Sequence, residues 1–286
     1  MHYFSTKSKV LIPAIIYGTA WKKERTAELV ELAIKNGFRG IDTACQPKHY
    51  NEPGVGNGIR RACRDTVSRK DLFIQTKFTP LRGQDPENIP YDSKAPLSEQ
   101  VRQSVALSLR NLQIKYLDSL ILHSPIKPWD ALLEVWDTME ALVTEGKVKL
   151  LGISNCDNVE LLRLIYQTAS IKPSIVQNRF YQRTHYDAKI RDYCYQKELV
   201  YQGFWTLTAN PDLLKSTVLQ HISERHNSTV EQVFFRFLTT IGVAPLIGTT
   251  SEEHMQEDLN IFSIELTDKE RHSIGQLLYP PKSKKQ

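Results

Sequence analysis

The chain contains few cysteines and no long apolar run. Its four cysteines include no CxxC pair, and no run approaches the ~18 apolar residues that a membrane-spanning helix needs. Its eight histidines form no HExxH or comparable ligand spacing, so we expect neither a structural nor a catalytic metal. Because the sequence also has no recognisable signal peptide, it predicts a reduced, cytoplasmic protein without a membrane partner.

The chain also lacks a concentrated patch of one charge. The net charge is +5 and the pI is about 8.9, but Lys and Arg are scattered along presumed helix faces. Nucleic-acid recognition needs a basic stripe with aromatic or motif support, so we expect no nucleic-acid partner. The content of 41% hydrophobic and 24% charged residues is typical of a globular protein, and 286 residues suit two ordinary domains or one α/β barrel.

Short apolar runs alternate eight times with amphipathic segments along the chain. The runs are continuous rather than alternating and rich in Val, Ile and Leu, which is typical of strands buried on both faces. They cover residues 12–19, 39–44, 72–77, 117–123, 149–155, 174–180, 199–204 and 243–248. Eight strand–helix units without a break in composition predict one α/β domain over residues 1–286, a (β/α)8 TIM barrel.

Four segments fall outside this repeat. Residues 1–12 are expected to form an N-terminal hairpin that covers the barrel floor, and residues 279–286 a flexible tail. The segment 78–96 contains four prolines and no periodicity, and the segment 205–226 carries an extra helical pattern over residues 210–226. Both follow strand C-termini, so we expect them on the face where barrel enzymes keep their active sites.

Polar side chains end five of the otherwise apolar strands. Taken alone, each has an ordinary explanation as a cap, a surface lysine or a structural histidine. Because strand C-termini converge at the mouth of a barrel, the set as a whole indicates a functional site. Its members are Asp42, Lys77, His123, Ser154 with Asn155, and Gln177, and Tyr50 follows the first of them closely.

These residue types suit proton transfer to a carbonyl oxygen. An isolated buried carboxylate is too costly to keep, so we expect Asp42 to pair with Lys77. A tyrosine with a pKa of about 10 is a poor acid at neutral pH, and we expect the Lys77 ammonium to lower the pKa of Tyr50. Tyr50 would then donate a proton to a developing alkoxide while His123 orients the carbonyl oxygen. No nucleophile is required, which suits hydride transfer from a carried cofactor.

Several motifs of this chain resemble those of the aldo-keto reductases, and they occur in that family's order. They are "GFRGIDTA", "DLFIQTKF", "SLRNLQIKYLDSLILHSP", "EALVTEGKVKLLGISN", "IVQNRF" and "PLIGTTSEEHMQEDL". The resemblance implies reduction of aldehydes or ketones to alcohols with NAD(P)H, and a catalytic set of Asp42, Tyr50, Lys77 and His123. Two readings remain open beside it: an enzyme working mainly as an alcohol dehydrogenase, and a nicotinamide-binding regulatory subunit with little turnover.

The resemblance also implies where cofactor and substrate would bind. Asp42, Gly18 and Thr19 would lie near the nicotinamide and its ribose, while Ser154, Asn155 and Gln177 would hold the carboxamide and Phe204 would stack on the ring. Thr206, Leu207 and Thr208 would follow the pyrophosphate, with Glu257 and Asp258 near the adenine. The substrate pocket would be formed by Trp21, His49, Tyr50, His123 and Ser124.

The chain departs from the family at several places that matter for mechanism. Compared with the family's usual spacing between the catalytic aspartate and tyrosine, "QPKHYNE" carries two extra residues. An alignment that counts back from Asn51-Glu52 would therefore put His49, rather than Tyr50, at the position of the catalytic tyrosine. We prefer Tyr50, because the chemistry requires a phenol, and keep His49 as the rival. Ser124 replaces an aromatic residue after the catalytic histidine, and the family's long C-terminal loop is largely missing, so we expect a more open pocket. We expect a small carbonyl compound as substrate and a monomeric enzyme.

A further departure concerns the cofactor. Gly248 stands where NADPH-dependent members have a lysine, and His254 stands where they have an arginine. Thr249 and Thr250 remain as hydroxyl donors to a phosphate near a helix start. We therefore expect NADPH to be favoured with weakened selectivity, NADH to be usable, and NADPH affinity to rise as pH falls and His254 gains charge.

Overall fold

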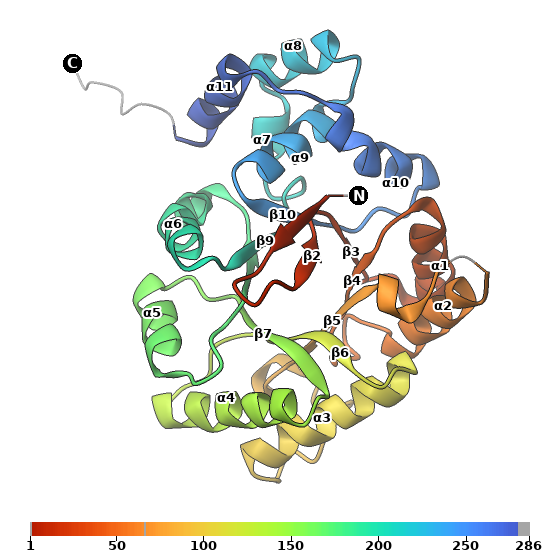
Figure 1. The fold of residues 1–286 in the computed structure, drawn as a ribbon, viewed down its shortest axis with the longest axis vertical. Helices are drawn as coiled ribbons and strands as arrows, with labels where there is room; N and C mark the ends of the chain where they lie inside the picture. Colours follow the sequence, from red (N-terminus) through yellow and green to blue (C-terminus); the bar gives the residue numbers. More distant parts are fainter. Residues whose placement is uncertain (1, 66, 280–286) are drawn as a thin grey trace.

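Eight parallel strands close into a barrel in chain order. The computed structural model describes residues 2–65 and 67–279 of the protein. The barrel strands are β3 (Ile16–Gly18), β4 (Gly40–Asp42), β5 (Phe73–Phe78), β6 (Leu117–Leu122), β7 (Val148–Ser154), β8 (Ile175–Arg179), β9 (Val200–Phe204) and β10 (Val243–Ile247). β10 pairs with β3 and completes the ring (Figure 1). The predicted (β/α)8 barrel is confirmed.

Helices surround this ring of strands. The helices that follow successive strands are α1 (Thr26–Asn36), α2 (Glu52–Asp65), α3 (Leu97–Leu112), α4 (Trp129–Thr144), α5 (Val159–Thr168), α6 (Ala188–Lys197), α9 (Val230–Thr240) and α10 (Glu252–Leu259). Further helices are α7 (Pro211–Leu214) and α8 (Thr217–Arg225) in the β9–α9 connection, and α11 (Asp268–Leu278) near the end of the chain. Short 3-10 turns occur at Lys23–Arg25, Arg69–Asp71, Leu81–Gly83, Gln182–Asp187 and Asn260–Ser263. None of the helices within residues 2–65 and 67–279 is both long and apolar enough to cross a membrane.

The helices are held to the barrel by apolar stripes. In α4, Leu132, Trp136 and Met139 are buried against the strands, as expected for apolar residues at helical spacing. Gly146 follows the end of this helix with φ of 73°, a conformation that glycine adopts without strain, and its N–H group donates to the Val143 carbonyl. Amphipathic patterning in the sequence therefore corresponds to the outer layer of the core.

The N-terminal hairpin covers the floor of the barrel, as predicted. Its strands β1 (Tyr3–Ser5) and β2 (Leu11–Pro13) pair antiparallel, and Ile12 packs with Ile16 and Phe73 in a second cluster inside the barrel. The single strand predicted over residues 12–19 is wrong, because its first part belongs to β2 and only Ile16–Gly18 enters the barrel. Pro13 has no N–H group to donate to a neighbouring strand, which suits the hairpin better than a central parallel strand.

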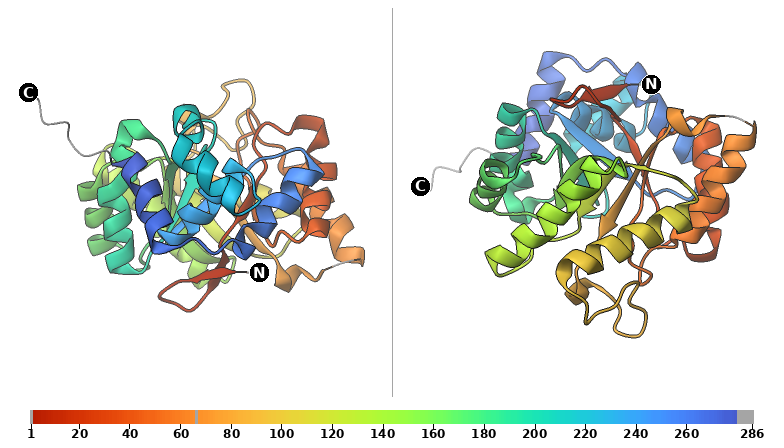
Figure 2. Two further views of the ribbon diagram at one scale, coloured as in Figure 1. Left: turned by 90° about the horizontal axis from the view of Figure 1, so that it is seen from above. Right: turned by 60° about the horizontal axis from the view of Figure 1, so that its bottom comes forward.

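The two long connections lie at the opposite end from the hairpin. Figure 2 shows the hairpin on one side of the barrel and the loop after β5 on the other. That loop contains only one 3-10 turn, but Gln84 and Tyr91 are buried. The Tyr91 hydroxyl donates to the Thr79 carbonyl at 2.8 Å. The predicted helical pattern over residues 210–226 forms α7 and α8. Of the predicted tail, only Tyr279 lies within the described residues.

Candidate active site

A buried ion pair lies at the mouth of the barrel. Asp42 ends β4, and Lys77 is the penultimate residue of β5. The Lys77 Nζ atom donates to Asp42 Oδ2 at 2.6 Å and to the Thr43 carbonyl at 2.8 Å, and both charged side chains are 3% exposed or less. Burial lowers the pKa of Lys77, and the Asp42 carboxylate offsets part of that effect. The predicted pairing of these two residues is present.

The second carboxylate oxygen of Asp42 is bonded to glutamines of the neighbouring strand β5 and of β8 across the barrel. Oδ1 accepts hydrogen bonds from Gln75 at 2.7 Å and from Gln177 at 3.0 Å. Both amide groups also donate to Gln202 Oε1, at 2.8 and 2.9 Å. Among the described residues, none donates to Gln177 Oε1, so that oxygen keeps its capacity to accept a hydrogen bond from a bound molecule.

Tyr50 lies next to Lys77 and His123. The Lys77 ammonium is 5.3 Å from the centroid of the Tyr50 ring, and the Tyr50 and His123 rings meet edge to face at 6.2 Å. Burial, followed by the Asp42 charge, raises the pKa of Tyr50 well above its ordinary value. The expected lowering of this pKa by Lys77 is therefore wrong, because burial disfavours the phenolate and the Asp42 charge adds to that effect. Tyr50 holds its proton at neutral pH.

The segment that carries Tyr50 is anchored by a buried carboxylate two residues later. Glu52, the first residue of α2, accepts hydrogen bonds from the Thr76 hydroxyl at 2.6 Å and the Ser108 hydroxyl at 2.8 Å. Thr76 precedes Lys77 in β5, so this contact fixes the start of α2 against the strand that supplies the lysine. Burial raises the pKa of Glu52.

His123 follows β6 and is held as a neutral imidazole. Its Nδ1 atom lies 2.7 Å from the Thr79 hydroxyl. Burial and then the nearby Lys77 charge lower the pKa of His123 well below its ordinary value. Asn155, with φ of 53°, donates to the His123 carbonyl at 2.8 Å and to Ser154 Oγ at 3.2 Å, so the ends of β6 and β7 are joined at the mouth.

His49 occupies a different place from Tyr50. Its ring packs on Trp21 with centroids 4.0 Å apart, and its Nδ1 atom lies 2.9 Å from Gln46 Oε1. Trp21 is 58% exposed and donates its backbone N–H group to the His49 carbonyl at 2.8 Å. The structure therefore places Tyr50 with the Lys77 and His123 side chains, and His49 with the exposed Trp21.

The other expected cofactor residues lie at the same end of the barrel. They terminate or directly follow strands, or belong to the first helix after β10. Gly18 ends β3, and Thr19 follows it and donates to the Asp42 carbonyl at 2.9 Å. Phe204 ends β9, and Thr206, Leu207 and Thr208 come soon after it. Gly248, Thr249 and Thr250 follow β10, and α10 carries His254, Glu257 and Asp258. His254 is exposed, whereas Asp258 is buried, and burial raises its pKa to about 7. Ser124, beside His123, is partly buried.

Two cations at the mouth were not found from the sequence. Lys22, in the loop after β3, donates to the Gly248 carbonyl, and a Cβ atom at Gly248 would lie 3.6 Å from Lys22 Nζ. Arg179, at the end of β8, stacks over the Trp205 ring at 4.2 Å, and no described carboxylate pairs with it. For Lys22, the only signal in the sequence was the pair Lys22-Lys23. For Arg179, the signal was its position two residues after Gln177, which places both side chains on the same face of the strand.

Comparison with known proteins agrees with this architecture. The sequence model described as "Aldo/keto reductase family" matches residues 14–278. The chain belongs to the aldo/keto reductase family. As a member, it is an NAD(P)-dependent oxidoreductase that acts on carbonyl or alcohol groups.

Relatives within this family span most of the chain. Glyoxal reductase of Bacillus subtilis (strain 168) is 34% identical over 250 residues, which cover 87% of this chain and 82% of that protein. NAD(P)H-dependent D-xylose reductase of Pachysolen tannophilus is 28% identical over 315 residues, covering 97% and 93% of the two chains. The solved aldose reductase of Schistosoma japonicum shares the fold with a TM-score of 0.82 at 24% identity, over 96% of this chain and 87% of that one.

Proposed function

We propose that this protein reduces aldehydes or ketones to alcohols with NAD(P)H, and that Tyr50 is the proton donor. The observation that carries the proposal is that the Tyr50 ring lies beside both the buried Lys77–Asp42 pair and the His123 ring. A protonated phenol beside a fixed cation can release its proton when negative charge develops on a nearby oxygen.

Each residue of this cluster has a separate part in the proposed mechanism. Bound NAD(P)H would supply the hydride. Tyr50 donates its proton to the substrate oxygen, and the Lys77 ammonium stabilises the phenolate that remains. Asp42 keeps Lys77 charged and in place. If the Thr79 hydroxyl donates to His123 Nδ1, the imidazole proton resides on Nε2, where it can hold the carbonyl oxygen.

The Tyr50, Lys77 and His123 side chains bear on the alternatives. Reduction needs a protonated phenol, and Tyr50 is protonated at neutral pH. A regulatory subunit with little turnover would not require the Tyr50, Lys77 and His123 cluster at all.

The residues at the mouth fit a nicotinamide cofactor. The free acceptor on Gln177 Oε1 suits the carboxamide N–H group, and Phe204 offers a ring at the adjacent strand end. Lys22 supplies a cation beside Gly248, where the sequence provides no lysine after β10. We therefore propose NADPH as the favoured cofactor and NADH as a usable one, and a monomeric cytoplasmic enzyme acting on a small carbonyl compound.

A turnover assay tests the proposal directly. The purified chain should oxidise NADPH in the presence of a generic aromatic aldehyde and should bind NADPH in its absence. Cofactor binding without turnover across a panel of aldehydes and ketones would instead support the regulatory role.

A further inference from the structure

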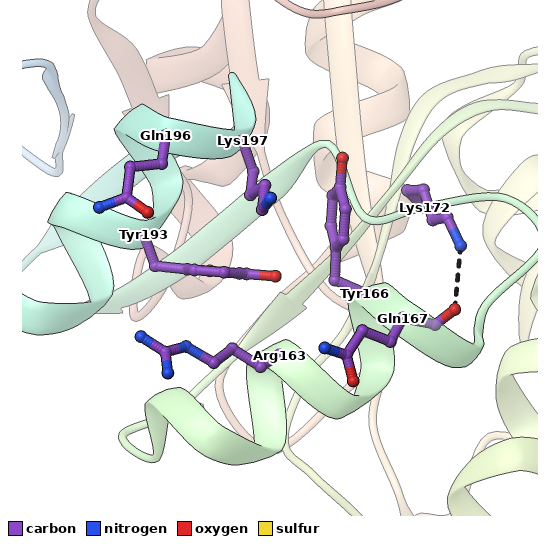
Figure 3. Close-up of a pocket in the computed structure, with 7 residues that line it drawn as sticks. All are labelled: Arg163, Tyr166, Gln167, Lys172, Tyr193, Gln196 and Lys197. Atoms are coloured by element: carbon purple, nitrogen blue, oxygen red, sulfur yellow. Dashed lines mark hydrogen bonds between the residues drawn. The ribbon is translucent and has the colours of Figure 1, made fainter.

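A groove rich in tyrosine and basic residues lies on the outer surface of the barrel, between α5 and α6. Its volume is about 410 Å³, and the side chains that define it here are Arg163, Tyr166, Lys172, Tyr193 and Lys197 (Figure 3). A second cavity of about 280 Å³ shares Tyr166, Lys172 and Lys197 and continues toward the barrel floor. We call the two together the α5–α6 groove.

The groove concentrates positive charge. No Asp or Glu lines the larger cavity and Glu198 alone borders the smaller one, while among the described residues neither Lys172 nor Lys197 pairs with a carboxylate. Lys172 donates only to backbone carbonyls, at Gln167 and Ala169. Arg163 lies 3.3 Å from Glu160, but both side chains are largely exposed, so that pair is weak. Like charges gathered in one concavity repel each other, and a bound anion would relieve that repulsion.

Two tyrosine rings lie close to these cations. Tyr166 and Tyr193 meet edge to face with centroids 6.0 Å apart. Lys197 Nζ lies 5.8 Å from the first ring and 5.9 Å from the second, and Lys172 Nζ lies 5.8 Å from the first. The Arg163 guanidinium lies 5.5 Å from the Tyr193 ring. Within the described chain, neither tyrosine hydroxyl has a hydrogen-bond partner, so both can donate to a ligand.

We propose that the α5–α6 groove binds a phosphorylated planar molecule of the nucleoside monophosphate class. The phosphate would lie where the two cavities meet, at Lys172, Lys197 and the Tyr166 hydroxyl, since these residues border both. The planar ring would lie toward Tyr193 and Arg163, whose ring and guanidinium plane stack on aromatic bases. The larger cavity is within the range of about 300–1,000 Å³ typical of small-molecule sites.

This site is separate from the mouth of the barrel. The smaller cavity is bordered by Lys7 of the N-terminal hairpin and by Lys149 and Ser174 near the starts of β7 and β8. The expected cofactor residues lie at the opposite ends of the strands. The proposed ligand and the cofactor should therefore bind independently, whether or not the proposed reductase function holds.

Calorimetric titration of the protein saturated with NADPH tests the proposal. Uridine 5′-monophosphate is the probe, because uridine is no part of the cofactor. We expect it to bind at least about tenfold more tightly than uridine or inorganic phosphate, since it alone uses both the rings and the ammonium groups. Lys197→Glu should weaken binding by at least about tenfold, while Lys189→Glu, an exposed α6 position outside the groove, should leave it unchanged.

Lys197 makes no hydrogen bond in the described structure, so its variants should fold, and Lys197→Gln provides a second, milder removal of charge. Four results would overturn the proposal: no detectable binding of the probe, binding that survives both Lys197 variants, binding to the cofactor-free protein that is lost once NADPH is present, or phosphate binding as tightly as the nucleotide. The last would indicate an adventitious ion only.

Discussion

The ammonium nitrogen of Lys77 lies 5.3 Å from the centroid of the Tyr50 ring. The two residues come from different elements, a barrel strand and the loop before α2, and the Glu52 carboxylate fixes that helix against the strand. The cation faces the phenol while its own charge is balanced by Asp42. This arrangement leaves Tyr50 protonated but places a positive charge where phenolate would form, so Lys77 acts on the proton transfer rather than on the resting state.

Replacing Lys77 with Met should abolish turnover, because the long apolar stem is kept and the charge is lost. The variant should fold, but the free energy of unfolding should fall by about 3–5 kcal/mol, since Asp42 is left buried without its cation. Steady-state kinetics and urea denaturation measure the two effects. Adding Asp42→Asn should restore part of the stability and none of the activity. Full activity in Lys77→Met would remove the cation from the mechanism.

Lys22 should contribute to the choice of cofactor. Lys22→Met should raise the Kd for NADPH by roughly tenfold or more and change the Kd for NADH much less, because a hydrogen bond to a charged group contributes about 1.5–3 kcal/mol. Fluorescence titration with both cofactors provides the comparison, with His254→Gln as the variant at the arginine position. An equal loss for the two cofactors would mean that Lys22 only holds the loop against Gly248.

Much of this site was predictable because strand ends follow from short apolar runs. Asp42, Lys77 and His123 lie at or next to the ends of such runs, Gln177 lies within one, and barrel closure brings them together. The contact between Lys22 and Gly248 was not predictable, because it joins loops 226 residues apart. The pKa of Tyr50 was predicted in the wrong direction, because a sequence shows neighbouring charges but not the loss of water around the hydroxyl.

The loop after β5 likewise required the structure. Its four prolines indicated an irregular segment, but not that Gln84 and Tyr91 are buried. Both bond to the Thr79 carbonyl, so the two ends of the loop are anchored while its middle is exposed.

Removing residues 86–88 should therefore alter KM across a set of aldehydes. The melting temperature should stay within a few degrees of the wild-type value, which corresponds to a change in the free energy of unfolding of under about 1 kcal/mol. Tyr91→Ala serves as the comparison and should lower the melting temperature more. A large loss of stability with unchanged KM on removing 86–88 would make the exposed part a packing element.

Asp258 should make stability depend on pH. Burial raises its pKa to about 7, above the ordinary value of 3.8, so the folded state keeps a proton that the unfolded state releases. Its contribution to stability is therefore fully present below about pH 4 and is lost as the pH rises to 7. Asp258→Asn should be more stable than wild type at pH 8, and the difference should shrink at pH 5. Because one pKa unit corresponds to about 1.4 kcal/mol, the difference at pH 8 should reach up to roughly 4 kcal/mol. Denaturant titration at both pH values measures it; a difference independent of pH would contradict the assignment.

The most direct test of the account is a comparison of Tyr50→Phe with His49→Ala. We measure kcat for an aromatic aldehyde and the Kd for NADPH in both variants. If Tyr50 is the proton donor, Tyr50→Phe lowers kcat by about 100-fold or more, the usual scale of a lost general acid, with little change in the Kd for NADPH. His49→Ala then remains active, because His49 packs on Trp21 rather than against Lys77. An active Tyr50→Phe together with an inactive His49→Ala would contradict the account.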